Sequence, residues 1–441
     1  MTAPVGGVTS PHEEAALLEW VEELNEGAGI EAHGRMEIGL AHGATVVEQP
    51  EQLEVSRREV HGGVGGAQAP HRFMTEEREQ ETGARATLLE QAATLRLGVG
   101  WYHAGVVYLQ KQLLKTNNVL PYDITGDPGG IMRAIAVEDF SVGPKLVELP
   151  VPEPGRGEVL VKVHAASVNG FDATVSSGAL QGMMEHHFPV VLGKDFSGQV
   201  EAVGESVSGL APGDAVFGVL MREFLGDGTF AEYVVVPEAI GLAKMPSGLD
   251  YAEAGALGLA GAAAVAGLDA LAPSHGHSLL IAGATGGVGS LAIQLARARA
   301  AEVIATARPG EEARFVAELG ANETADYTAD MEAVLRSRYP EGVDAVLHLA
   351  GDAAQLARLV RSGGRLASTL GVGADQLLGP EISATAVMAM PGAPVLSSLG
   401  AETAAGRLRV PIQRQYRLEE VPQALGDFGQ GTLGKLAVAI A

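Results

Sequence analysis

Residues 278–297 read SLLIAGATGGVGSLAIQLAR. A short apolar run, Ser278–Ala282, leads directly into a glycine-rich turn, and a helix with apolar anchors follows it. Gly286 lets backbone approach a bound pyrophosphate, Gly289 lets the helix pack closely on the strand, and the helix N-terminus presents free N–H groups. Ala284 stands where the first glycine of the usual fingerprint would be. The stretch predicts a strand, turn and helix that bind a dinucleotide.

The chain around this motif alternates apolar runs with helical patterns, which predicts a parallel sheet with helical crossovers. After about Ala256 we expect six strands of a Rossmann sheet: Ser278–Ala282, Glu302–Ala307, Asn322–Asp326, Val343–Leu349, Gly364–Thr369 and Ile382–Met390. Between Met132 and Ala256 the runs are β-rich and separated by turns, which indicates a compact β-barrel-like domain. These runs are Arg133–Val137, Val159–Ala166, Gly198–Val203, Ala215–Val219 and Phe230–Val236.

The end of the second Rossmann strand predicts which dinucleotide is bound. Sites specific for NAD place an Asp or Glu there to bind the ribose 2′-hydroxyl, and here the chain reads Thr306-Ala307-Arg308-Pro309. A guanidinium binds a phosphate through both charge and geometry. We therefore expect NADPH as the cofactor, with a solvated strand-end arginine as the alternative.

Composition excludes several classes of function. The 441 residues carry a formal net charge of −24, which argues against nucleic acid and anionic membrane surfaces as partners. No cysteine is present, so disulfides, thiolate nucleophiles and cysteine-ligated zinc are excluded. The first residues show no basic segment followed by an apolar run, and we expect a cytoplasmic protein.

The first 131 residues lack a catalytic pattern. We expect a capped amphipathic helix over about 11–26, a glycine-containing loop or disordered linker over 27–72, and helical spacing again over 87–114. The turn-forming stretch PYDITGDPGG, 121–130, marks a boundary. Residues 1–131 are thus predicted to be a mainly helical, partly disordered extension that is dispensable for catalysis.

Several separated motifs after Met132 resemble the zinc-free quinone oxidoreductase branch of the medium-chain dehydrogenase/reductase superfamily. They occur in the family's order over about 310 residues. The motifs are AASVNGFD (165–172), FPVVLGKDFSGQVEAVG (188–204), PGDAVFG (212–218), GTFAEYVVVP (228–237), AGATGGVGSLAIQLAR (282–297) and GKLAVAI (434–440).

The resemblance implies an α/β fold in which a GroES-like β-barrel domain is interrupted by a doubly wound Rossmann domain. The implied divisions are an extension at 1–131, the first part of the GroES-like domain at 132–255, the Rossmann domain at 256–392 and a return to the barrel at 393–441. It also implies that the cofactor lies in the cleft between the two domains. The residues implied or predicted to contact it are Asn169, Ala284, Gly286, Gly287, Val288, Gly289, Thr306, Arg308, Tyr327 and Lys435.

Zinc-dependent relatives carry a Gly-His-Glu triplet where this chain has Gly193-Lys194-Asp195. A lysine is no zinc ligand at neutral pH, and the neighbouring His186 and His187 lack a third ligand, so we expect no metal. Glu312 also departs from the family, which often has a lysine there beside the 2′-phosphate.

The function implied is NADPH-dependent reduction of a quinone or an α,β-unsaturated carbonyl compound by a homodimer. Candidate catalytic residues are Asp172, Lys194 and Asp195, whose alternative roles are a turn or helix cap for Asp172 and a paired barrel contact for the other two. Two alternatives stay open: a dinucleotide-binding module that senses redox state or serves as a scaffold, and an enoyl reductase or tailoring enzyme of a biosynthetic pathway.

Overall fold

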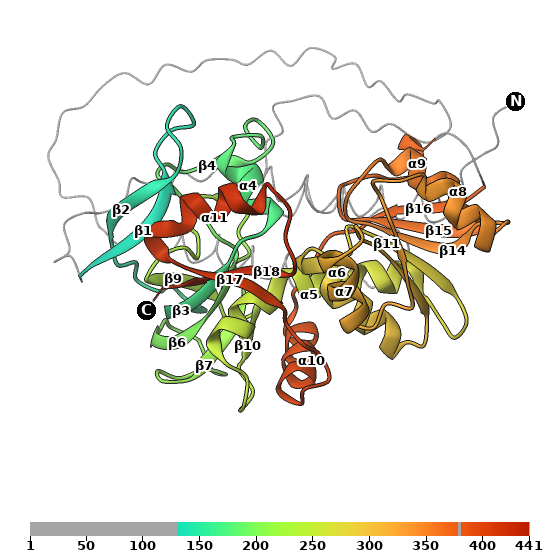
Figure 1. Ribbon diagram of the computed structural model, residues 1–441. Helices are drawn as coiled ribbons and strands as arrows, with labels where there is room; N and C mark the ends of the chain where they lie inside the picture. The colour runs from blue at the N-terminus through green and yellow to red at the C-terminus, as the bar shows by residue number, and fades with distance from the viewer. Residues whose placement is uncertain (1–129, 378–380, 441) are drawn as a thin grey trace, which may run out of the picture. The chain divides into compact units, whose positions relative to one another are not determined.

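The computed structural model describes residues 130–377 and 381–440 (Figure 1). The helices and linker expected within the first 129 residues lie outside this range. The barrel begins one residue earlier than the expected boundary, because β1 starts at Ile131 and the Gly130 carbonyl accepts a hydrogen bond from Val151 N at 3.2 Å.

The first domain is built from short strands, because its sequence alternates β-branched residues with turn formers. All five β-rich runs expected from the sequence form strands. The strands are β1 (Ile131–Val137), β2 (Lys145–Pro150), β3 (Glu158–Ser167), β4 (Glu185–His186), β5 (Val190–Val191), β6 (Asp195–Val203), β7 (Ala215–Val219), β8 (Phe224–Leu225), β9 (Tyr233–Pro237) and β10 (Leu242–Lys244).

The end of the chain completes this barrel. Strands β17 (Ile412–Arg417) and β18 (Lys435–Ala439) return to it, and β18 pairs antiparallel with β3, with Val438 opposite Ala166 (Figure 1). The sheet order is β10-β7-β6-β3-β18-β17, and β9 also pairs with β3. Residues far apart in sequence therefore share one hydrophobic core.

The second domain is a six-stranded parallel sheet with the order β13-β12-β11-β14-β15-β16. Its strands coincide in position with the six that the sequence predicts. They are β11 (Ser278–Ala282), β12 (Glu302–Thr306), β13 (Glu323–Ala325), β14 (Val343–His348), β15 (Val360–Ser368) and β16 (Ser383–Ala386).

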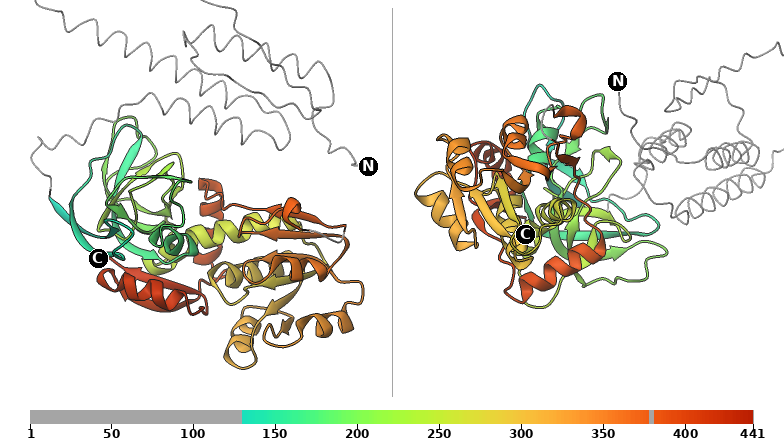
Figure 2. Two further views of the ribbon diagram at one scale, coloured as in Figure 1. Left: turned by 90° about the horizontal axis from the view of Figure 1, so that it is seen from above. Right: turned by 90° about the vertical axis from the view of Figure 1, so that its right-hand side faces the viewer.

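Helices cover both faces of this sheet because its central strands are apolar on both sides (Figure 2). Leu279 and Ile281 pack in one core cluster, with residues of α5 and α6, whereas Leu280 packs in another, with residues of α8 and α9. These helices are α5 (Tyr251–Leu271), α6 (Gly287–Ala298), α7 (Glu311–Glu318), α8 (Met331–Arg338) and α9 (Ala353–Arg358). The fold is the expected GroES-like barrel combined with a doubly wound Rossmann sheet.

Helix α5 connects the two domains. It begins at the Asp250 cap, whose side chain accepts a hydrogen bond from Glu253 N at 2.8 Å. Gly255 and Gly258 let it lie close to the barrel, because an added Cβ would meet Ala165 O at 2.8 Å or Gly218 O at 3.0 Å. The helix is long and apolar enough to span a membrane, but 72% of its most apolar window is buried inside the protein. We interpret it as a core helix.

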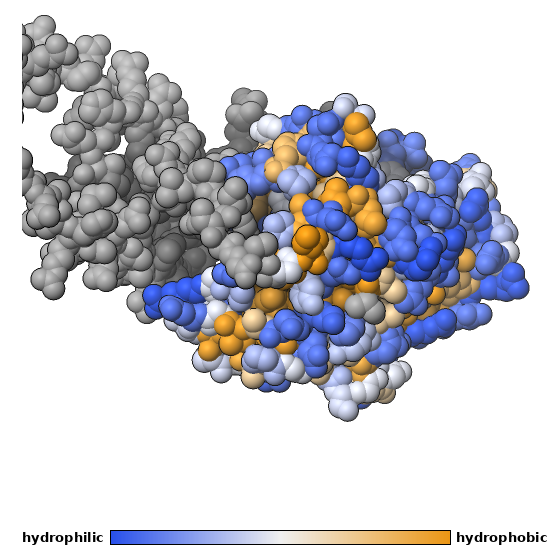
Figure 3. Space-filling view, turned by 90° about the vertical axis from the view of Figure 1, so that its left-hand side faces the viewer, coloured by the Kyte–Doolittle hydropathy of each residue, from blue (hydrophilic) through white to orange (hydrophobic). Residues whose placement is uncertain are grey.

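Shorter helices complete the two domains. Helix α4 (Gly170–Ser176) follows β3, and α11 (Val421–Phe428) lies between β17 and β18. Helix α10 (Ala393–Ala404) packs against α5 and β10. Two 3-10 turns, η1 (Ala374–Gln376) and η2 (Leu418–Glu420), precede β16 and α11. On the face shown in Figure 3, small apolar patches are separated by hydrophilic side chains.

Candidate active site

The glycine turn after β11 has the geometry of a phosphate-binding loop. Gly286 caps helix α6, and a Cβ added there would meet only Gly283 O, at 3.7 Å, so the space beyond it is open. Gly289 is packed tightly, because an added Cβ would lie 2.3 Å from Gly283 O. The first N–H groups of α6 have no intrahelical partners and point toward that open side. The turn therefore fits the pyrophosphate of a dinucleotide.

Three other residues of the predicted cofactor set support this turn from within the protein. Ala284 is fully buried, and Val288 packs against the same core. The Thr306 hydroxyl accepts a hydrogen bond from Gly283 N at 3.0 Å and donates one to Ile281 O at 3.3 Å. Thr306 is 5% exposed, so it fixes the turn against the neighbouring strand.

The barrel touches the cofactor loop at the start of β18. Gly434 N donates to Thr285 O at 2.7 Å, which joins the two domains by a backbone bridge. The methylenes of Lys435 lie across Gly287, where an added Cβ would be 2.5 Å from Lys435 Cδ. Gly287 is therefore required for the contact between the two domains.

A buried polar network extends from this contact into the barrel. Lys435 Nζ donates to Asn169 Oδ1 at 2.6 Å and to Asp195 Oδ2 at 3.3 Å. Asn169 Nδ2 also donates to Asp195 Oδ2, at 2.9 Å, as does the Ser167 hydroxyl, at 2.7 Å. Lys435 and Asp195 are 3% and 0% exposed. Such a buried charge pair is tolerated because further hydrogen bonds compensate its desolvation.

Asp195 also ties helix α5 to the barrel, because its Oδ1 accepts a hydrogen bond from Leu259 N at 2.7 Å. The sequence placed Asn169, Asp195 and Lys435 near the site but missed Ser167. A serine inside a strand pattern carries no signal of a buried partner, and only the register of β3 against β6, Ser167 opposite Asp195, reveals it.

Asp172 lies in the first turn of α4, whose N-cap is Asn169, and its side chain completes the capping box. Its carboxylate accepts a hydrogen bond from Asn169 N at 2.8 Å and is 1% exposed. Burial raises the pKa of Asp172 to about 7, although the hydrogen bond from Asn169 opposes the rise. The contact orients Asn169, which is the helix-cap role that the sequence offered as the alternative to catalysis.

Lys194 differs from the other two candidate catalytic residues. Its ammonium lies 5.0 Å from the centre of the Phe171 ring and makes no hydrogen bond or ion pair with any residue in 130–377 or 381–440. Burial lowers the pKa of Lys194, and the nearby carboxylates of Asp172 and Asp227 offset part of that lowering. Lys194 is thus a partly buried proton donor without a protein acceptor in the described part of the chain.

Arg308 and Tyr327, two of the residues expected to contact the cofactor, meet at the carboxyl edge of the sheet. Thr306 lies opposite Ala325 in the β12–β13 pairing, so Arg308 and Tyr327, two residues further along each strand, emerge at the same level. Both contact Glu312: Arg308 forms a 2.6 Å ion pair with it, and the Tyr327 hydroxyl donates to it at 3.2 Å. Arg308 precedes helix α7 and Glu312 lies in its first turn, so the carboxylate reaches back to the segment before the helix.

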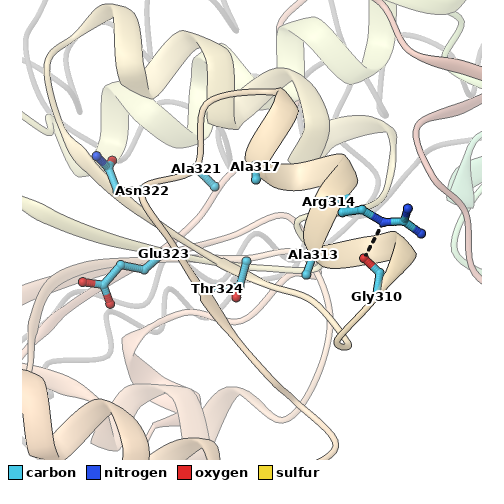
Figure 4. Close-up of a pocket in the computed structure, with 8 residues that line it drawn as sticks. All are labelled: Gly310, Ala313, Arg314, Ala317, Ala321, Asn322, Glu323 and Thr324. Carbon is cyan, nitrogen blue, oxygen red and sulfur yellow. Dashed lines mark hydrogen bonds between the residues drawn. The ribbon is translucent and has the colours of Figure 1, made fainter.

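A separate shallow hollow of about 490 Å³ lies between α7 and β13. It is lined mainly by small residues, and Arg314 Nε at its side donates to Gly310 O at 3.3 Å (Figure 4). None of the predicted site residues lines it. Within the described ranges, no three His, Asp or Glu side chains are grouped closely enough to hold a metal ion.

The chain combines a GroES-like barrel with a Rossmann sheet, and the last strand of the barrel contacts the phosphate-binding turn of the sheet. This arrangement defines an oxidoreductase of the medium-chain dehydrogenase/reductase class. Two family models match the chain in agreement with this class. Residues 155–247 match the alcohol dehydrogenase GroES-like domain, and residues 287–401 match the domain described as zinc-binding dehydrogenase.

Known proteins narrow the class to a family. The chain is 31% identical over 332 residues to the quinone oxidoreductase of Lama guanicoe, covering 70% of this chain and 98% of that protein. It is 35% identical over 227 residues to the chloroplastic NADPH-dependent alkenal/one oxidoreductase of Arabidopsis thaliana, covering 50% of this chain and 57% of the relative. The solved quinone oxidoreductase of Coxiella burnetii matches with a TM-score of 0.63 at 28% identity, over 71% of this chain and 100% of that one. The chain belongs to the quinone oxidoreductase family and is an oxidoreductase that uses a nicotinamide dinucleotide.

Proposed function

We propose that this enzyme is a zinc-independent, NADPH-dependent reductase of quinones or α,β-unsaturated carbonyl compounds. The observation that carries the proposal is the contact of Lys435 with Gly287, since it sets the buried Asn169 network beside the turn that fits a pyrophosphate. A dinucleotide extended from that turn would bring its nicotinamide to the barrel wall. NADPH is favoured by Arg308 and by the absence of an acid directly at the end of β12.

The bound cofactor would supply a hydride to the conjugated carbon of the substrate. The chain's part is to orient the reactants, exclude water and provide the proton that completes the reduction. We assign that proton to Lys194, because its ammonium donates to no acceptor within the described residues, and a kcat unchanged in Lys194→Met would assign it to solvent instead. Asp172 and Asp195 act as positioning residues, because their carboxylates bind Asn169.

Zinc independence is supported by the chain's inventory of ligands. It contains no cysteine, and a lysine and an aspartate follow Gly193 where zinc-dependent relatives have His and Glu. Polarisation of a substrate carbonyl then depends on hydrogen bonds.

Purified enzyme assayed with NADPH against a panel of quinones and enones tests the proposal. We expect turnover that survives exhaustive chelation, and a Lys194→Met variant whose kcat falls by about tenfold or more while NADPH binding is kept. Activity that is lost on chelation and restored by zinc would contradict zinc independence. Binding of NADPH with no turnover of any panel member would favour the alternative of a redox-sensing or scaffold module.

We also propose a homodimer formed through the edge of the Rossmann sheet. Strand β16 pairs with β15 on one side, and no described strand lies on its other side. An open edge of this kind offers unpaired N–H and C=O groups to a second strand. Met388 and Met390, just beyond β16, are 76% and 64% exposed, which adds apolar surface to the edge. Sedimentation of a monomer at micromolar concentration would contradict this proposal.

A further inference from the structure

Arg308 and Tyr327, the residues that we expect at the 2′-phosphate, bind a carboxylate of their own chain, that of Glu312. Glu312 Oε2 accepts a hydrogen bond from Arg308 N at 2.7 Å, and Glu312 Oε1 accepts one from Arg308 Nε at 2.8 Å. The Arg308 terminal nitrogen also lies 2.6 Å from Oε1, and the Tyr327 hydroxyl donates to the same carboxylate. A phosphate bound by this arginine and tyrosine would use the same donors.

Glu312 is held more firmly than an ordinary surface carboxylate. Its side chain is 12% exposed, whereas that of Arg308 is 60% exposed. Burial acts to raise the pKa of Glu312, but the hydrogen bonds from Arg308 and Tyr327 outweigh it and leave the pKa below its ordinary value. Glu312 therefore stays ionised at neutral pH and keeps its place between the two donors.

We propose that Glu312 is the residue that sets how strongly the enzyme distinguishes NADPH from NADH, by competing with the 2′-phosphate for Arg308 and Tyr327. The inference rests on the proposed use of NADPH and refines it. A 2′-phosphate has to displace the Glu312 carboxylate, which already neutralises Arg308. The two negative groups also repel each other wherever they remain close. A dinucleotide without that phosphate meets a carboxylate able to accept a hydrogen bond from its 2′-hydroxyl. Glu312 consequently makes the preference for NADPH over NADH weaker than Arg308 and Tyr327 alone would give.

The test replaces Glu312 by Gln, which keeps the size and an acceptor oxygen but removes the charge. Glu311→Gln is the matched control, because Glu311 is the exposed neighbour in the first turn of the same helix and no hydrogen bond or ion pair joins it to Arg308 in the described structure. Dissociation constants of the full chain are measured by calorimetry for NADPH, NADH, 2′,5′-ADP and 5′-AMP. The last two probes isolate the 2′-phosphate and require neither nicotinamide nor turnover.

We expect Glu312→Gln to tighten binding of 2′,5′-ADP and NADPH by about tenfold or more, with little gain for 5′-AMP and NADH. Glu311→Gln should change each constant by less than about threefold. The gain in affinity from Glu312→Gln should be smaller when Arg308 is also replaced by Ala, because no guanidinium is then freed from the carboxylate to bind the phosphate.

Three results would overturn the inference. Equal effects of the two glutamine variants would mean that only the overall charge of the helix end matters. Weaker NADPH binding in Glu312→Gln would mean that the carboxylate orients Arg308 toward the phosphate. If neither the natural protein nor any variant binds NADPH or NADH, the proposed function itself is wrong. The melting temperatures of the same samples show whether misfolding explains such a loss of binding.

Discussion

Asp172 is a carboxyl group buried in the wall of the active site, and its protonation links stability to pH. Its pKa rises to about 7 from an ordinary value of 3.8, because burial disfavours the charged form. The folded chain therefore holds this proton at pH values where the unfolded chain has lost it. The free energy of unfolding consequently falls as the pH rises from about 4 to about 7, and above that range the cost is constant.

Replacing Asp172 by Asn should remove this slope. The amide oxygen can still accept the hydrogen bond from Asn169 N, but the side chain no longer ionises. At pH 8 we expect the variant to be more stable by up to about 4 kcal/mol, because each tenfold change in proton affinity on folding corresponds to about 1.4 kcal/mol. Denaturant unfolding at pH 5 and pH 8 measures the difference.

Asp139→Asn provides the control for this measurement. Asp139 is exposed, and its pKa is lowered by hydrogen bonds from Ser141, so its removal should leave the slope between pH 4 and pH 7 in place. A slope unchanged in Asp172→Asn would show that other groups cause it.

The turn between β11 and α6 shows how glycines in one element serve different purposes. Gly286 has φ −72°, a conformation open to any residue, and free space around it. Gly289 faces the backbone of Gly283 and Ala284. A Cβ added to it would lie 2.3 Å from Gly283 O and 2.6 Å from Ala284 Cα, which is too close for any side chain. Gly286 therefore leaves room for a ligand, and Gly289 allows the helix to pack closely on the turn.

A pair of alanine substitutions separates these purposes. Gly289→Ala should lower the free energy of unfolding by about 3 kcal/mol, because helix α6 has to move away from the turn. Gly286→Ala should unfold almost as the natural protein does and bind NADPH at least about tenfold more weakly, since its methyl group occupies the phosphate's space. Denaturant titration and calorimetry give the two quantities, and equal losses of stability in both variants would contradict the assignment.

The elements themselves follow from local patterns to different degrees. The central strands β11, β12 and β14 were predictable because buried parallel strands are nearly continuous apolar runs. The edge strands β13 and β16 have no such run, and their prediction rested on the alternation of strands with helices. The buried network was predictable only as a set of residues near the cofactor. Its hydrogen bonds depend on the pairing of β18 with β3, which brings together Lys435 and Val168 although they are 267 positions apart in the chain. No local sequence pattern encodes that pairing. The Arg308–Glu312 pair lay closer to the reach of sequence reasoning, because its two residues are only four positions apart, although Arg308 lies before helix α7.

At the scale of the whole molecule, the chain divides at Pro121 into two units, and every candidate site residue belongs to the second, Tyr122–Ala441. The family matches also fall within that unit, at 155–247 and 287–401. Strand β1 depends on Gly130 and Ile131 for its first contacts, so a shortened chain has to begin before them.

A chain that starts at Tyr122 should therefore fold, bind NADPH and reduce a quinone at a rate within about twofold of the full-length enzyme. It retains the hydrophobic core of the barrel and the core that packs helices α5 and α6 on the Rossmann sheet. It also retains the hydrogen-bonded network of Lys435, Asn169 and Asp195 beside the cofactor turn. Calorimetry with NADPH and turnover with one quinone should be measured on both lengths of chain, and thermal melting shows whether the shortened protein is folded. A shortened protein that melts cooperatively and binds NADPH but turns over no substrate would show that residues 1–121 shape the active site, since the cofactor site would be intact while the substrate side of the cleft would be lost.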